Sequence, residues 1–366
     1  MIARPIFLSN LIAFLIDTRF STINVATWAS SDFNSRWVWE TCTMKLGLGR
    51  IIASVALAMA CGSAASASLI VDNFEGSSAS NYTVATEATP DGTSDFAFDY
   101  VAAGLPLAPN SAPGGGRGLR FTANTTVPTG IDAYTAFHNT FIDTINTPQY
   151  LVTVDVYMGF AGTSTTEFAA VGVGGNGLVT NKVGPGTNPA TGQSGSGSFL
   201  SFSGDGAAAR DYLWYLDTAN GGVGTVSAVT AAGPPTFTIS PTYLAGGAGS
   251  ELPLYNSIFP GTTPINGGSP SNRWTTVGIL VDQNLNQISY SIGGTIIVAG
   301  TFTGTMNGRV SLGYADLFPS VAPGLVFGIF DNLSVTAVPE PSTFALLAPV
   351  AAGAWVVRRR RLAKVA

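Results

Sequence analysis

Apolar and polar residues alternate with a period of two through the middle of the chain. The alternation is clearest in LVTVDVYM at 151–158, WTTVGILVD at 274–282, QISYSIGGTIIVAGTF at 287–302 and VFGIFDNLSV at 326–335. This period, with many β-branched residues, is typical of half-buried strands. Gly293-Gly294 separates two such runs and predicts a tight hairpin, because both central residues of a primed turn need positive φ. The sequence has no long segment with a helical period.

Glycine and proline collect between the alternating runs, notably at 112–118, 184–197 and 246–268. Strand patterns resume after each cluster, so we expect long surface loops within one domain rather than linkers. Many short strands predict an all-β fold in which two antiparallel sheets pack as a β-sandwich. LIVDNFEG at 69–76 and FGIFDNLSV at 327–335 are the expected terminal strands, which we predict to lie side by side.

A second kind of pattern, a charged start followed by an apolar run, begins at Met44. Two basic residues precede the apolar run 51–60, and Ala65-Ser66-Ala67 follows as a small-residue cleavage site. This order predicts a signal helix at 44–67 and a mature chain from Ser68.

The residues around this signal leave two points open. Residues 1–43 precede a complete signal, and we interpret them as a spurious extension. A lipoprotein signal ending at Cys61 is less favoured, because Ala58 stands where a large aliphatic residue is expected.

The C-terminal segment 338–366 begins with Val338, Pro339, Glu340 and Pro341, and its apolar run ends in Arg358, Arg359, Arg360 and Arg361. As a helix, the uncharged run 344–357 rises about 21 Å. A hydrocarbon core is about 30 Å thick, so the run spans it only if flanking residues dip inward and the arginines extend outward. We expect a short transmembrane helix with its arginines in the cytoplasm. A buried terminal helix is the alternative, which four adjacent arginines disfavour.

The order of these tail residues resembles the PEP-CTERM sorting signal of exopolysaccharide-producing Gram-negative bacteria. The resemblance implies that a membrane exosortase reads the tail and cuts near the Pro-Glu-Pro triplet. It implies export machinery and the membrane as partners, a transient stay at the outer face of the inner membrane, and then the cell surface or extracellular matrix. It covers about the last thirty residues only.

Charge and rare residue types narrow the chemistry of the predicted sandwich, residues 68–337. Six basic and seventeen acidic residues give it a net charge of −11. Nucleic acids and anionic membrane surfaces need a basic face, so we expect neither as a partner of the sandwich. Both cysteines, Cys42 and Cys61, precede it, and His138 is its one histidine, so disulfides and the usual zinc sites are excluded.

The last strands, RWTTVGILVDQNLNQISYSIGGTII and GRVSLGYADLFPSVAPGLVFGIFDNLSV, resemble those of concanavalin A-like and laminin G-like jelly rolls. A galactose-binding-like sandwich fits nearly as well. Retaining glucanases of the concanavalin A-like type carry a Glu-x-Asp-x-x-Glu strand, which is absent here, and the four glutamates of residues 68–337 are scattered. His138 alternates with aromatic residues and is predicted to be a hydrogen-bonded strand residue rather than a base. We therefore expect no catalytic activity, with a polysaccharide-degrading enzyme as the less favoured class.

Aromatic residues beside polar ones are the expected site of contact with a polysaccharide, because rings stack on the apolar faces of sugars. RDYLWYLDT at 210–218 places such residues on both faces of one strand. The candidate glycan-binding residues are Arg210, Tyr212, Trp214, Tyr215 and Asp217. Packing between the sheets is the competing explanation for the rings, and it is favoured for Trp274 as well.

A structural calcium ion is the one cofactor that the sequence suggests. Asp72, Glu75 and Asp331 lie on the two expected terminal strands, where oxygen ligands could close the sandwich. Solvated surface carboxylates are the alternative. The overall prediction is an exported, exosortase-processed β-sandwich that contacts extracellular polysaccharide. The competing class is a structural surface protein without a ligand.

Overall fold

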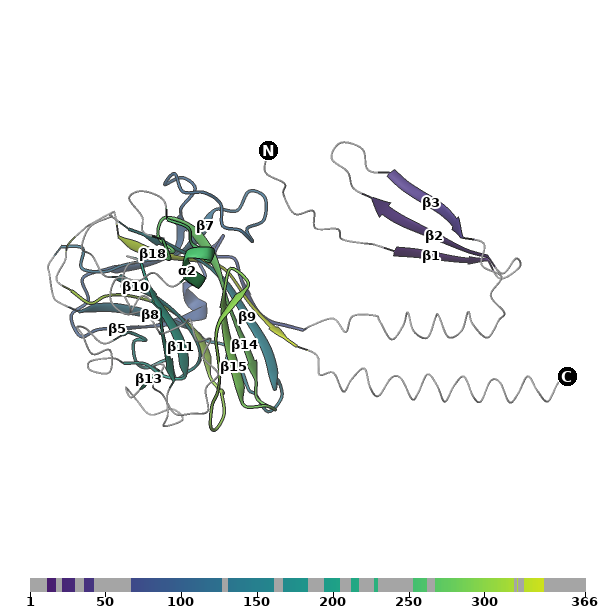
Figure 1. Ribbon diagram of the computed structural model, residues 1–366. Coiled ribbons are helices and arrows are strands. Elements are labelled where there is room, and N and C mark those ends of the chain that lie inside the picture. Colours follow the sequence, from purple (N-terminus) through teal and green to yellow (C-terminus); the bar gives the residue numbers. More distant parts are fainter. Residues whose placement is uncertain are drawn as a thin grey trace. The chain divides into compact units, whose positions relative to one another are not determined.

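The computed structural model describes residues 67–126, 131–160, 167–183, 194–204, 212–216, 255–261, 267–318, 321 and 326–338 (Figure 1). For residues 12–17, 22–29, 36–42, 227–229 and 253–254 it describes the backbone alone. The chain divides into two compact units, one of residues 66–338 and one of residues 1–65 with 339–366. Apart from Ala67 and Val338, the predicted signal helix and sorting tail lie outside the described residues. Within the described residues no helix is long and apolar enough to cross a membrane.

The larger unit contains two antiparallel sheets. The order in the first, called sheet 1, is β13 (Ser227–Val229), β12 (Tyr212–Leu216), β11 (Ser198–Ser203), β10 (Glu167–Gly175), β17 (Arg309–Asp316), β8 (Asp132–His138) and β5 (Tyr82–Thr86). The order in sheet 2 is β16 (Thr295–Thr301), β15 (Gln287–Ile292), β14 (Trp274–Asp282), β9 (Gln149–Gly159), β18 (Phe327–Ala337), β7 (Arg117–Thr122) and β6 (Thr93–Asp99). The two sheets face each other as the layers of a sandwich, which confirms the predicted architecture (Figure 1).

The alternation read from the sequence determines which side chains enter the core between the sheets. On β9 the inward residues are Val152, Val154, Val156 and Met158, and the inward residues of β14 meet them in one cluster. Sheet 1 contributes large rings to the same cluster, Trp214 among them. Removing this apolar surface from water is the main source of stability for a unit without disulfides.

The terminal strands lie together as predicted. Strand β4 (Ser68–Asp72) pairs with β18, and Val335 lies opposite Ile70. Residues Gly293 and Gly294 have φ values of 56° and 80° and join β15 to β16, which confirms the predicted hairpin.

The glycine-rich stretch 246–268, predicted as loop, contains one short helix, α2 (Pro253–Ile258). A 3-10 turn, η1 (Ala79–Asn81), precedes β5. The first stretch, 112–118, ends inside β7, which begins at Arg117. Two of the predicted loops are therefore shorter than expected. Glycine and proline indicate that regular structure is interrupted, but they do not show at which residue the next helix or strand begins.

The smaller unit contains a three-stranded antiparallel sheet in the order β1 (Ile12–Asp17), β2 (Thr22–Ala29) and β3 (Arg36–Cys42). It falls within residues 1–43, which the sequence analysis interpreted as a spurious extension.

Candidate functional site

Strand β12, the predicted glycan-binding strand, is buried on both of its faces. Trp214 points into the core between the sheets, where its indole N–H donates to Ser198 Oγ at 2.7 Å. On the same side, Tyr212 stacks on Tyr255 with ring centroids 3.8 Å apart. Tyr215 points to the opposite side and stacks on Phe199 at 4.8 Å. The expectation that one face of this strand presents rings to solvent is therefore corrected, and Arg210 and Asp217 lie outside the described residues.

The second buried face exists because sheet 1 carries a smaller apolar cluster on the side away from the main core. Leu213 and Tyr215 pack there with Phe168, Phe199 and Val183. Val183 belongs to a segment between strands. The alternation of residues along β12 cannot show that such a segment covers its second face. The rings of β12 are packing residues on either side.

The three predicted calcium ligands have separate protein partners. Asp72 accepts hydrogen bonds from Tyr82 Oη at 3.0 Å and from the backbone N–H of Phe74 at 2.9 Å. Glu75 accepts the N–H of Gly116 at 2.7 Å. The partner of Asp72 in β18 is Leu333, so Asp331 lies further along that strand, at a break in the register of β18 with β9. Within the described residues no group of three or more His, Cys, Asp or Glu is placed to hold a metal ion.

Asp331 instead forms a buried acidic pair with Asp155. The two residues lie opposite each other on β18 and β9, and both are fully buried. Asp155 accepts hydrogen bonds from the backbone and side-chain N–H groups of Asn110 at 2.9 and 2.8 Å, from Thr276 Oγ1 at 2.6 Å and from Asn332 Nδ2 at 3.0 Å. These four donors compensate for the loss of hydration of one carboxylate.

Asp331 accepts fewer hydrogen bonds than Asp155 does. It accepts bonds from Tyr100 Oη at 2.8 Å, Ser111 Oγ at 2.9 Å and the N–H of Asn332 at 2.7 Å. Burial raises the pKa of Asp331, the three donors offset part of this rise, and the neighbouring charge of Asp155 adds to it, so that the pKa is about 6.

The acidic pair holds down the connection between β6 and β7, residues 100–116, which we call the strap. Asn110 and Ser111 of the strap bind the two carboxylates, and the indole N–H of Trp274 donates to Pro106 O at 2.7 Å. Beneath the strap, Tyr100 packs with Tyr157 and other apolar residues in a small cluster on the outer side of sheet 2. The strap thus covers aromatic surface that an isolated sheet would expose.

The raised pKa of Asp331 predicts a pH-dependent stability. A carboxyl group whose pKa is higher in the folded state contributes stability that is full below about pH 4 and is lost as the pH rises through about 6. Asp331→Asn cannot titrate. We expect the melting temperature of the wild type, relative to Asp331→Asn, to fall by about 4 °C between pH 4 and pH 7.5. A difference that stays constant across this range would contradict the assignment.

An open hollow of about 440 Å³ lies beside the strap. Pro109 of the strap forms one part of its wall, and Phe259, just after α2, forms another. The start of β14, with Arg273 and Trp274, and the residues around Thr295 complete it. Four separate stretches of the chain therefore meet at this place.

The two large polar side chains of the hollow are held in position. Trp274 is half-buried, and its ring centroid lies 5.0 Å from that of Tyr100 and 5.4 Å from that of Tyr157. Arg273 donates from Nη1 to Pro260 O at 3.1 Å, and its guanidinium lies 5.8 Å from the centroid of Phe259. Contacts of this kind already restrict the rotamers of the two side chains, which lowers the entropy cost of ordering them when a ligand binds.

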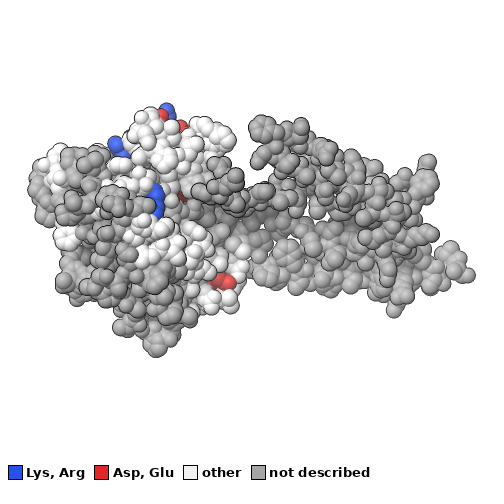
Figure 2. Space-filling model, turned by 45° about the horizontal axis from the view of Figure 1, so that its top comes forward, with Lys and Arg blue, Asp and Glu red and all other residues white. Residues whose placement is uncertain are grey.

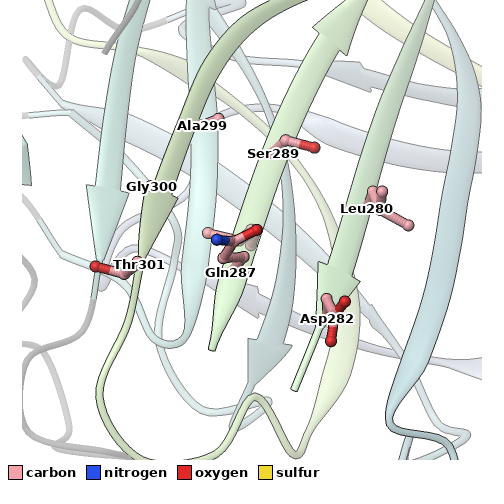
Figure 3. Close-up of a pocket in the computed structure, with 8 residues that line it drawn as sticks. Leu280, Asp282, Gln287, Ser289, Ala299, Gly300 and Thr301 are labelled. Atoms are coloured by element: carbon pink, nitrogen blue, oxygen red, sulfur yellow. The ribbon is translucent and has the colours of Figure 1, made fainter. Parts of the chain in front are cut away.

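A second, smaller groove of about 240 Å³ crosses β14, β15 and β16 (Figure 3). Leu280 and Asp282 of β14 lie on one side, and Gln287 and Ser289 of β15 lie beside them (Figure 3). Its lining contains neither an aromatic ring nor a basic side chain. Among the described residues on the face shown in Figure 2, charged side chains are few. The hollow at Trp274 therefore offers the richer set of ligand contacts.

His138 and the carboxylates that meet across the strands of sheet 1 are buried. His138 is a strand residue whose Nδ1 accepts the N–H of Thr140 at 3.1 Å, as predicted, and burial lowers its pKa. Carboxylates do meet across strands, since Asp316 lies opposite Asp132 and Glu167 in sheet 1. These three side chains are no more than 2% exposed, which hides them from a substrate in this conformation.

Comparisons with known proteins leave the family open. No family model and no curated protein matches the chain. A Bacillus subtilis protein of unknown function with a galectin-like fold overlaps at a TM-score of 0.35 and 10% identity, over 74% of this chain and 96% of its own. The carbohydrate-binding module CBM66 from Bacillus subtilis superposes with a TM-score of 0.29 and 7% sequence identity, over 58% of this chain and 89% of its own. A carbohydrate esterase from the Shiga toxin-encoding bacteriophage phi24B superposes with a TM-score of 0.37 and 9% sequence identity, over 75% of this chain and 100% of its own. These scores are too low to assign a ligand, and the resemblance of the tail to a sorting signal remains a prediction.

Proposed function

We propose that this chain is an exported protein whose jelly-roll sandwich, of the concanavalin A-like type, binds polysaccharide in the hollow at Arg273 and Trp274. The observation that supports this most is the composition of the hollow, in which an indole ring and a guanidinium group adjoin hydroxyl-bearing residues such as Ser257 and Thr295. Sugars present apolar C–H faces and rings of hydroxyl groups, so they need both kinds of contact. A pocket with a few convergent polar groups is the usual form of a ligand site.

The hollow replaces β12 as the expected place of contact. Trp274 is half-buried, whereas Trp214 is fully buried. In the described part of the chain every tyrosine is buried as well. Phe141 and Phe318 are 60% and 39% exposed, but neither lines the hollow. Among the tryptophan and tyrosine rings of the described residues, Trp274 is therefore the one on which a sugar could stack.

A glycan array probed with the purified protein tests this proposal. We expect binding to one or more polysaccharides, reduced about tenfold or more in Trp274→Ala because the stacking surface is lost. Trp274→Phe keeps a ring and should retain most of the signal. Leu280→Ala, in the groove of Figure 3, serves as the control and should bind like the wild type. A blank array for the folded wild type favours a structural surface protein without a ligand.

Export is the second part of the proposal, and it is supported by the sequence patterns at 44–67 and 338–366. We infer processing after Ala67, transient anchoring by the C-terminal helix, exosortase cleavage near Pro339-Glu340-Pro341, and release to the cell surface or matrix. Mass spectrometry of the protein from the surface fraction should find Ser68 at its start and no Arg358–Arg361. Recovery of the uncut chain from cytosol alone would refute this part.

A further inference from the structure

We propose that the hollow selects acidic polysaccharides, in which a sugar carboxylate pairs with Arg273. This inference rests on the proposed function and deepens it by naming the chemical class of the ligand. Three observations support it: the charge of Arg273 has no acidic partner among the described residues, Arg273 precedes Trp274 in the hollow, and its hydrogen-bond partners are neutral.

Arg273 has only neutral partners in the part of the chain that the structure describes. Its Nη1 and Nε donate to the carbonyl oxygens of Pro260 and Ser271, at 3.1 and 3.5 Å. The ion pair found among the described residues is Lys182–Glu87, at 2.8 Å, and it involves neither Arg273 nor any residue of the hollow. The two carbonyl groups therefore orient the guanidinium but leave its charge uncompensated.

Asp155 is linked to the hollow through Thr276. Thr276 lines the hollow and donates its hydroxyl to Asp155 Oδ1 at 2.6 Å. Asp155 is fully buried, and its oxygens already accept bonds from Asn110 and Asn332. It makes no ion pair with Arg273, and no other carboxylate of the described residues does, which leaves room for a carboxylate of the ligand.

A uronic acid residue matches this arrangement. Its carboxylate accepts two parallel hydrogen bonds from a guanidinium fork, a geometry that a lysine ammonium cannot reproduce. The sugar ring that bears the carboxylate could then lie against Trp274, within reach of hydroxyl groups such as that of Thr295. The same side chains would hold a neutral sugar less tightly, because the charge of Arg273 would have no counter-ion.

The acidic character of the protein does not prevent this pairing. The sandwich region 68–337 has a net charge of −11, which repels polyanions at long range. This repulsion is screened over about 8 Å at physiological ionic strength, whereas the contact with Arg273 is direct. Selectivity would therefore come from one contact rather than from a basic surface.

Affinity measurements with two forms of one polymer test the inference. The probes are polygalacturonate and its fully methyl-esterified form, which share a backbone and differ in charge. The proteins are the wild type, Arg273→Gln, Arg273→Lys and the control Arg309→Gln, which changes an arginine of sheet 1. We expect the wild type and the control to bind the charged polymer about tenfold or more tightly than the ester. Arg273→Gln should bind both forms equally, and Arg273→Lys should regain only part of the difference.

The outcomes separate this inference from the proposal on which it rests. If the wild type binds the ester, or neutral polymers on the array, as tightly as the acid, and Arg273→Gln changes nothing, the inference is overturned while polysaccharide binding stands. If neither polymer binds and the array is blank, both fail. If Arg273→Gln and Arg309→Gln weaken binding alike, a general charge effect replaces the specific pair and the inference is overturned.

Discussion

Replacing Trp214 by alanine is expected to lower the free energy of unfolding by about 3–5 kcal/mol, a cost typical of truncating a large buried ring. Trp214 is fully buried between the sheets, its N–H donates to Ser198 Oγ, and its ring centroid lies 6.3 Å from that of Tyr290. The substitution leaves a cavity and removes a donor from Ser198, which also bonds Tyr290 Oη at 2.8 Å. Urea denaturation followed by circular dichroism measures the effect.

The control for this prediction is Leu280→Ala, since Leu280 is 42% exposed on the outer side of sheet 2. It should cost about 1 kcal/mol or less. If Trp214→Ala were no more destabilising than this control, Trp214 would not be a core residue. Any loss of glycan binding in Trp214→Ala is expected to follow from the loss of stability, not from a missing contact.

Replacing Asp155 by alanine is expected to destabilise the sandwich by about 3 kcal/mol and to loosen the strap. The change removes the buried acceptor of four donors on Asn110, Thr276 and Asn332. It also removes the repulsion between Asp155 and Asp331, which favours the variant. The loss of four hydrogen bonds to a buried carboxylate outweighs this relief. Below about pH 6 the relief is smaller still, because Asp331 then binds a proton.

Hydrogen exchange detects the loosened strap directly. We expect faster exchange of the backbone amide of Asn110, which donates to Asp155, and little change in β12. Asp282→Ala is a matched control on β14, because Asp282 is partly exposed and its Oδ2 accepts one bond from Gln149 Nε2 at 2.7 Å. Equal exchange and equal stability in the two variants would show that the acidic pair does not hold the strap.

The strands could be predicted from the sequence because alternation and turn residues act locally. The expected run 274–282 coincides with β14, and the glycine pair at 293–294 forms the hairpin as predicted. The pairing of the terminal strands was also predicted correctly. Each of these features depends on one stretch of chain, or on two stretches with obvious patterns.

The candidate site could not be predicted in the same way. Arg273 and Trp274 stand at the start of a strand, and the sequence analysis favoured packing for Trp274. Only the fold brings Pro109 and Phe259 to them. The number of aromatic residues in 210–218 indicated β12 as the site. That number does not show whether the outer face of the strand is covered by other residues or exposed to solvent. Asp331 was predicted as a calcium ligand, yet its partner Asp155 is found only through the register of β9 and β18.

Hydrogen exchange of the protein with and without its bound polysaccharide is the most direct test of the central claim. The ligand would be the polysaccharide with the strongest array signal. The account predicts slower exchange in residues 255–261 and 293–295, which surround the hollow at Arg273 and Trp274. It predicts no change in the groove of β14, β15 and β16. Protection confined to that groove or to β12, with none around the hollow, would contradict it.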